Sequence, residues 1–256
     1  MPDRARGLWA QAVLLLGALT ACSPAPTPSL PAQPARLAVT PALGAFAFRE
    51  FAAWREEAGV PDFDLEIWPE AAALQAADEG EVAAILALSA PPEGWFAAPV
   101  GVEAIAVIVN PENPVRALDL EALAQIFSGR AQTWASLGGP AEPVSPVIPL
   151  PGDGLRAAFE DQVMAGAALS GGAFLAPSPE AALTIVAQNT GAIGLIPLAA
   201  ADDRARLVRI DGVLPTDETL QDGRYPLALP VLMISPEEPS GAIRDWIVWL
   251  QALEGT

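Results

Sequence analysis

Residues 104–139 read AIAVIVNPENPVRALDLEALAQIFSGRAQTWASLGG, and this stretch decides the fold class. It opens within an apolar, β-branched run that stops at Asn110-Pro111, which predicts a buried strand over residues 101–110. A helix is expected over residues 119–127, because Asp119 is a favourable residue at a helix start. A strand followed directly by a helix is the repeating unit of an α/β protein.

The same alternation of strand and helix continues outward in both directions. It predicts further strands at residues 37–40, 64–68, 82–88, 191–196, 207–210 and 227–235, and further helices at residues 46–59, 156–164, 179–188 and 240–253, with an Ala-rich helix that ends at residue 78. The pattern indicates an α/β protein with mostly parallel sheets. Trp68 and Trp95 stand at strand–loop junctions, where both core packing and a pocket remain open interpretations.

Composition excludes several classes of function. The chain has 256 residues with no His, and its 13 basic residues are all Arg against 31 acidic residues, a formal net charge of −18. Catalytic triads with His, Schiff-base lysines and His-ligated metals are therefore excluded. The single Cys excludes a disulfide framework and a thiolate metal cluster. Because no cluster of basic side chains could neutralise phosphates, we expect no nucleic acid partner.

The N-terminus predicts export and anchoring. Residues 1–21 read as a lipoprotein signal peptide, in which Arg4 and Arg6 precede an apolar run too short to span a bilayer. The run ends in Leu19-Thr20-Ala21-Cys22, which resembles the bacterial lipobox, whose Cys is lipidated; an ordinary signal peptide with an incidental Cys is the alternative. Residues 22–35 would then be the lipidated Cys and a Pro-rich, extended tether.

The middle of the chain is similar to the phosphate-binding proteins that serve bacterial phosphate ABC transporters. The family pattern is an apolar strand ending in Asn-Pro, a helix ending in Ile-Phe-x-Gly, then a Trp and a Gly-Gly turn. In this chain the matching residues are Asn110, Pro111, Asn113, Pro114, Val115, Leu118, Ile126, Phe127, Gly129, Trp134, Gly138 and Gly139, followed by residues 191–194, 210–216 and 223–227. The resemblance extends over about residues 37–253.

This resemblance implies a two-lobe clam of the periplasmic-binding-protein type, with mostly parallel sheets and a double-strand hinge. The hinge strands would be residues 102–109 and 227–234. Lobe 1 would consist of residues 36–104 plus 227–256, and lobe 2 of residues 105–226.

The resemblance also implies a ligand site built from helix N-termini, whose backbone N–H groups and hydroxyls bind an anion. Carried over position by position, the ligand-binding residues are Thr40, Ser89, Gly152, Asp153, Gly154, Leu155 and Arg156. The family's Arg, Ser and Thr in the last loop are replaced by Pro149, Asp153 and Leu155.

Two carboxylates change the expected chemistry of that site. Glu70 and Asp153 would repel an anion if they faced the ligand. Asp153 could instead cap the helix that follows, in which case its carboxylate would occupy the donors that an anion would use. Arg156 would remain as the countercharge.

These observations predict a membrane-anchored, extracytoplasmic solute-binding protein of an ABC transporter of the phosphate-uptake type, and not an enzyme. It would close on phosphate or another small ligand and hand it to a permease; a neutral or cationic solute is physically easier beside Glu70 and Asp153. The alternative is a non-transport envelope binding or interaction protein on the same fold, with no small ligand. We expect a monomer in the bacterial cell envelope, without metal or cofactor, attached to the membrane through lipid alone.

Overall fold

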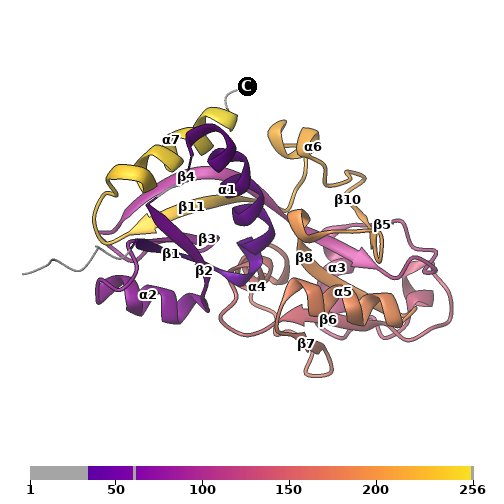
Figure 1. The fold of residues 1–256 in the computed structure, drawn as a ribbon. Coiled ribbons are helices and arrows are strands. Elements are labelled where there is room, and N and C mark those ends of the chain that lie inside the picture. The colour runs from indigo at the N-terminus through magenta and orange to yellow at the C-terminus, as the bar shows by residue number, and fades with distance from the viewer. Residues whose placement is uncertain (1–33, 60–61, 255–256) are drawn as a thin grey trace, which may run out of the picture. The chain divides into compact units, whose positions relative to one another are not determined.

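One long strand, β4 (Phe96–Val109), organises the sheet. The computed structural model describes residues 34–59 and 62–254. The first part of β4 pairs antiparallel with β11 (Ala228–Ser235) as far as Ala104, and from Ile105 onward it pairs antiparallel with β8 (Ala192–Pro197). β4 therefore belongs to two half-sheets, and together with β11 it forms the double-strand connection that the sequence predicts (Figure 1).

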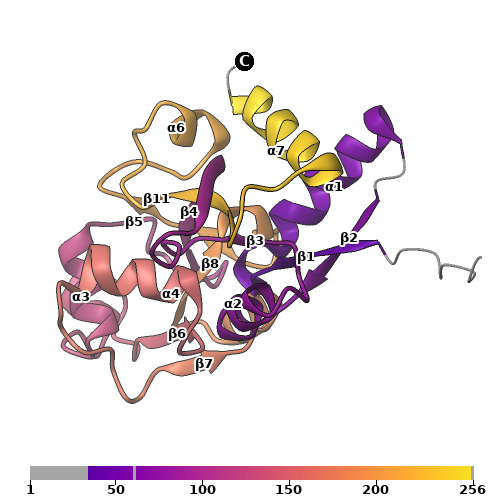
Figure 2. The same ribbon diagram turned by 90° about the vertical axis from the view of Figure 1, so that its left-hand side faces the viewer.

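The first half-sheet has the strand order β2-β1-β3-β11-β4. Strands β1 (Ala35–Val39), β2 (Phe63–Ile67) and β3 (Ala84–Ala87) are parallel, and β11 is antiparallel to β3. Figures 1 and 2 show α1 (Gly44–Ala58) and α7 (Gly241–Glu254) on one face and α2 (Glu70–Asp78) on the other.

Side chains of β1 alternate between the two faces, as strand geometry requires. Leu37 and Val39 belong to the core that contains Trp54 of α1 and Trp246 of α7, whereas Ala38 packs in the cluster formed with α2. The rings of Trp54 and Trp246 lie with their centroids 6.4 Å apart. Both tryptophan side chains are therefore core residues, 5% and 0% exposed.

The second half-sheet continues from β4 through β8 and β6 (Ser145–Pro149) to β7 (Phe174–Ala176), with β9 (Arg206–Leu207) also paired to β4. β6 is parallel to both of its neighbours. Helix α5 (Pro179–Gln188) covers one face, with Val186 packed in the same cluster as Ile108. The other core contains Phe127 and Phe159, from α3 (Leu120–Phe127) and α4 (Gly154–Phe159).

Short elements complete this part of the chain. They are the 3₁₀ turns η1 (Pro41–Leu43), η2 (Trp134–Leu137) and η4 (Leu198–Ala200), the π-helical turn η3 (Glu160–Met164), helix α6 (Asp217–Gln221), and a two-stranded sheet of β5 (Ala117–Leu118) and β10 (Arg209–Ile210). Both half-sheets lie within one compact unit, Pro34–Thr256.

The α/β prediction is confirmed, and the sheet is mixed. Pairing is parallel within β2-β1-β3 and within β8-β6-β7, and antiparallel along β3-β11-β4-β8. The helix expected at residues 156–164 begins two residues earlier, at Gly154, and ends in the π-helical turn η3. Trp68 and Trp95 are partly buried against the α2 cluster, which supports core packing for both.

The predicted signal peptide (1–21), the lipidation site Cys22 and the tether up to residue 33 lie outside the described residues. Strand β1 begins at Ala35, so the last residue of the predicted tether already belongs to the sheet. Among the helices that the structure describes, none has both the length and the apolar character needed to cross a membrane.

Candidate ligand-binding site

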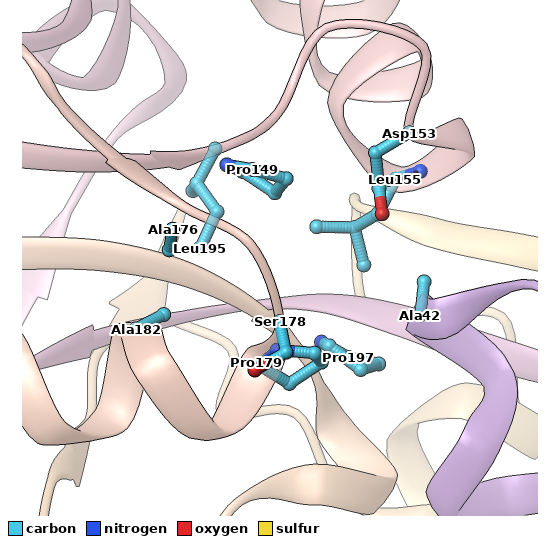
Figure 3. Close-up of a pocket in the computed structure, with 10 residues that line it drawn as sticks. All are labelled: Ala42, Pro149, Asp153, Leu155, Ala176, Ser178, Pro179, Ala182, Leu195 and Pro197. Atoms are coloured by element: carbon cyan, nitrogen blue, oxygen red, sulfur yellow. Dashed lines mark hydrogen bonds between the residues drawn. The ribbon is translucent and has the colours of Figure 1, made fainter. Parts of the chain in front are cut away.

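Three helix starts and three strand ends surround one small cavity (Figure 3). Its lining consists of Ala42, Pro149, Asp153, Leu155, Ala176, Ser178, Pro179, Ala182, Leu195 and Pro197. Ala42 comes from η1 beside the first half-sheet, and the other residues come from the second half-sheet and from the starts of α4 and α5. The carboxyl ends of strands in open α/β sheets are where ligands generally bind. The cavity measures about 10 Å³, close to the smallest volume that holds one water molecule.

Asp153 caps helix α4. Its backbone is extended, with φ −84° and ψ 131°, and Oδ1 accepts hydrogen bonds from the N–H groups of Leu155 (2.9 Å) and Arg156 (3.3 Å). Gly152 precedes it with φ +85°, a left-handed conformation that glycine adopts without strain. The capping interpretation of Asp153 is therefore confirmed, and its carboxylate holds two amide donors that an anion at α4 would need.

The environment of Asp153 disfavours its charge. Burial raises the pKa of this carboxyl group above its ordinary value of 3.8, while the hydrogen bonds from the Arg156 and Leu155 amides and the charge of Arg156 lower it. Because burial is the largest cause, desolvation outweighs the amide donors.

Arg156 is engaged within its own half. Its Nε donates to Glu160 Oε1 at 2.7 Å, and one terminal nitrogen donates to the Pro149 carbonyl at 3.2 Å. The side chain is not part of the cavity lining. The sequence assigns Arg156 as the positive charge that would pair with an anionic ligand. In the structure this guanidinium group pairs with Glu160 instead.

Residues from the two halves meet at Gly154. A Cβ atom at this position would lie 3.0 Å from Ser89 Oγ and 3.1 Å from Glu70 Oε2. Both distances are tighter than ordinary side-chain contacts, so a larger residue at position 154 would require the Ser89 or Glu70 side chain to move by a few tenths of an ångström. The structure therefore brings together Ser89 and Gly154, which the sequence assigns to the site, and Glu70, whose charge it identifies as unfavourable for an anion.

Glu70 is the second carboxyl group at this contact. Its Oε2 is buried, and no described residue hydrogen-bonds that atom. Burial raises the pKa of Glu70, the Ser89 hydroxyl lowers it, and the charge of Asp153 raises it. The two carboxyl groups thus interact electrostatically across the contact between the halves. The ionised form of each is destabilised, as the raised pKa values indicate.

Thr40 lies deeper than the family pattern implies. It is 2% exposed and stands between β1 and η1, where its N–H donates to the Leu86 carbonyl at 3.1 Å and its carbonyl accepts from Leu43 at 2.9 Å. Its hydroxyl does not cap η1, and the residue is not part of the cavity lining. In the structure Thr40 fixes the turn that presents Ala42.

Residues at the start of α5 also line the cavity, and the site prediction omitted them. Ser178 caps α5 by accepting a hydrogen bond from Ala181 N at 3.2 Å, and Pro179 occupies the first turn. The Ser-Pro-Glu sequence at 178–180 is a recognisable helix start, so it could have indicated a third helix N-terminus near the site.

Acidic side chains do not assemble into a metal centre in the part of the chain that the structure describes. Within residues 34–59 and 62–254, no three or more Cys, Asp or Glu residues are grouped as metal ligands would be.

Comparison with known proteins identifies the family. Residues 69–253 match the family described as the PBP superfamily domain. The chain belongs to the PBP superfamily. This PBP-superfamily chain is 28% identical over 154 residues to the phosphate-binding protein PstS of Bacillus subtilis (strain 168), a match that covers 60% of the chain and 51% of PstS. The chain therefore spans about half the length of this curated relative.

Solved structures show the same fold. A proposed phosphate ABC transporter substrate-binding protein from Clostridium perfringens, solved with bound phosphate, aligns with a TM-score of 0.77 at 23% identity, over 86% of this chain and 97% of that one. An ABC-type phosphate transport receptor from Vibrio cholerae aligns with a TM-score of 0.68 at 17% identity, over 85% of this chain and 93% of that one. The resemblance to phosphate-binding proteins is confirmed, and at these identities the structural likeness establishes the fold.

Proposed function

We propose that this protein is the solute-binding component of an ABC transporter of the phosphate-uptake type, and that it binds its solute between the two half-sheets. The family match and the named relatives support the class of function. The observation that carries the site is the convergence of η1, α4 and α5 on one cavity, with Glu70 and Gly154 in contact across the halves. The moving bodies would be residues 36–104 plus 227–256 and residues 105–226, since β4 changes partner between Ala104 and Ile105.

The chemistry of the site favours a solute other than phosphate. An anion at the start of α4 would have to displace the Asp153 carboxylate from two amides and then tolerate the charge of Glu70. A neutral or cationic small molecule need not displace Asp153 from these amides, and the charge of Glu70 does not repel it. The ligand residues of the site would be Ser89, Gly152, Asp153, Gly154 and Leu155, with Thr40 and Arg156 supporting the two helix starts.

The experiment is titration calorimetry of phosphate into the chain from Ser23 onward, at pH 6 and pH 8. We expect no binding heat at pH 8. A thermal-shift panel of neutral and cationic solutes then searches for the ligand, which should raise the unfolding temperature. Micromolar binding of phosphate at pH 8 would contradict our account of Asp153 and Glu70.

A second candidate function is a non-transport binding protein of the cell envelope. The cavity volume of about 10 Å³ and the internal occupation of the α4 amides favour it, because the site as described is already filled by the chain itself. Solution scattering discriminates between the two candidates. Compaction on addition of a solute supports the transport function, and unchanged dimensions across the whole panel support the second candidate.

We further propose that lipid on Cys22 anchors the protein, as a monomer, to the extracytoplasmic side of a bacterial membrane, with a transporter permease as its partner. The lipobox-like end of the apolar run at residues 19–22 supports this. Intact mass should show acyl chains on Cys22, and Cys22→Ala should move the protein from the membrane to the soluble fraction. An unmodified Cys22 in the mature protein would refute the anchor.

A further inference from the structure

A buried carboxyl group lies at the junction of the two half-sheets. Glu103 is 2% exposed and sits on β4 directly before Ala104, the last residue of β4 that pairs with β11; the next residue, Ile105, pairs with β8. Any change of angle between the halves must bend β4 beside this side chain. Neither the proposed ligand site nor the packing of the core uses a charge at this position.

Elements of both halves cover Glu103. Its Oε1 accepts hydrogen bonds from its neighbour Ala104 (2.8 Å) and from Ala199 N of η4 (3.3 Å), which follows β8 in the second half. η4 in turn contacts α1, which belongs to the first half. Separating the halves therefore pulls η4 away from α1 and opens the enclosure around the carboxyl group.

The charges around Glu103 are few. From α1, the Arg49 guanidinium acts on it, and Arg49 is itself paired with Glu50 at 2.8 Å. β11 presents Leu229 opposite it, and η4 presents backbone N–H groups. On α6, Asp217 lines the same outer cavity as Arg49.

One carboxyl oxygen of Glu103 has no hydrogen-bond partner among the described residues. This oxygen, Oε2, is buried. Burial raises the pKa of Glu103 from 4.5 to about 6, although the amides of Ala104 and Ala199 and the charge of Arg49 lower it. The charged form is thus penalised as long as η4 and α1 exclude water, and it is penalised more than the uncharged form.

We propose that Glu103 is a proton-dependent hinge residue: when uncharged it stabilises the arrangement with the halves in contact, and when charged it favours their separation, which admits water to Oε2. The inference rests on the closing motion of the proposed solute-binding function. It assigns to the hinge a dependence on pH that is separate from the ligand.

The raised pKa of Glu103 determines the direction and the size of the effect of pH on the ratio of closed to open molecules. A carboxyl group whose pKa is raised in one arrangement stabilises that arrangement fully below its ordinary pKa, and the stabilisation is lost as the pH rises through the raised value. The difference between 4.5 and about 6 corresponds to a factor of roughly 30 in the ratio of closed to open molecules. The change should occur between about pH 4.5 and pH 7.5.

The test measures the distance between the halves. The mature chain carries Cys22→Ser with spin labels at Asp78→Cys on α2 and Gln132→Cys after α3, both exposed positions. Pulsed electron paramagnetic resonance then gives the closed and open populations from pH 4.5 to pH 8. Glu70→Gln and Asp153→Asn are included in the parent, because the pKa of each of these carboxyl groups is also raised at the contact between the halves.

In this parent we expect the closed-to-open ratio to fall about 15-fold across the range, because about half of the 30-fold factor is already lost at pH 4.5. Adding Glu103→Gln should remove that dependence and leave the ratio at its low-pH value. Glu112→Gln, at an exposed carboxylate away from the junction, is the matched control and should behave like the parent.

A pH dependence that persists in Glu103→Gln overturns the proposal, and so does a parent without one. A loss confined to the unfolding temperature, with unchanged label distances, would mean that Glu103 is merely structural. Solutes from the panel, added to the labelled chain with native Glu70 and Asp153, distinguish the two proposals: a solute that shifts the distances when pH does not preserves the binding function and refutes the hinge role. The reverse result preserves the hinge role and refutes solute binding.

Discussion

Replacing Asp153 by Ser should create phosphate binding, which we expect the native chain to lack. The native carboxylate holds the Leu155 and Arg156 amides at 2.9 and 3.3 Å, and its charge lies where the ligand charge would be. Serine caps a helix about as well as aspartate, so helix α4 should begin at the same residue. The exchange removes the negative charge and leaves a hydroxyl group that can donate to an anion.

The expected gain comes mainly from the removed repulsion. Two like charges about 4 Å apart repel by about 1 kcal/mol in water and about 4 kcal/mol near a protein surface. Since about 1.4 kcal/mol is tenfold in affinity, Asp153→Ser should strengthen phosphate binding by roughly 5-fold to 700-fold. Adding Glu70→Gln should strengthen it further.

Calorimetry at pH 8 measures this directly, with thermal unfolding as the check on folding. Asp161→Ser removes an exposed charge in η3, outside the cavity lining, and serves as the control for net charge. It should leave phosphate binding undetectable. A folded Asp153→Ser protein that still gives no heat with phosphate would refute our account of the site, because the amides would then be unsuited to an anion for another reason.

Three further predictions concern stability. Glu70→Gln should raise the unfolding temperature at pH 8 and leave it unchanged at pH 4, because the raised pKa of Glu70 costs stability only once the group is charged; equal effects at both pH values would contradict this. Gly154→Ala should cost about 1–3 kcal/mol in urea unfolding through contact with Ser89 and Glu70, whereas Gly171→Ala, where a Cβ meets open space, should cost far less. Ser178→Ala should cost about 1 kcal/mol by removing the cap of α5, and an unchanged unfolding midpoint would show that the cap contributes nothing.

Local patterns predicted the regular elements well. The apolar run that ends at Asn110 and the helix expected over residues 179–188 correspond to the end of β4 and to α5 in the structure. Strand β6 escaped prediction because Pro146 and Pro149 lack the N–H group that a ladder uses, and proline in a run argues against a strand. The first part of β4 escaped because Pro99 interrupts it in the same way.

The site was harder to predict because contacts between halves decide it. The sequence suggested both roles for Asp153, and only the geometry shows that it caps α4. Arg156 is directed to Glu160, an i to i+4 partner that spacing alone could have indicated. Glu103 gave no signal, since a single acidic residue in an apolar strand reveals neither its burial nor its place at the junction.

The position of β11 has a consequence for folding. β11 lies between β3 and β4, so the central ladder of the first half-sheet is made by residues 228–235, close to the end of the chain. Strands β1, β2 and β3 cannot join β4 until these residues are available, whereas β4, β8, β6 and β7 pair within one continuous stretch. The second half should therefore acquire hydrogen-exchange protection first during refolding. Strands β1, β2 and β3 should therefore complete their pairing only after β11 has docked. Until then their apolar side chains stay exposed and favour aggregation.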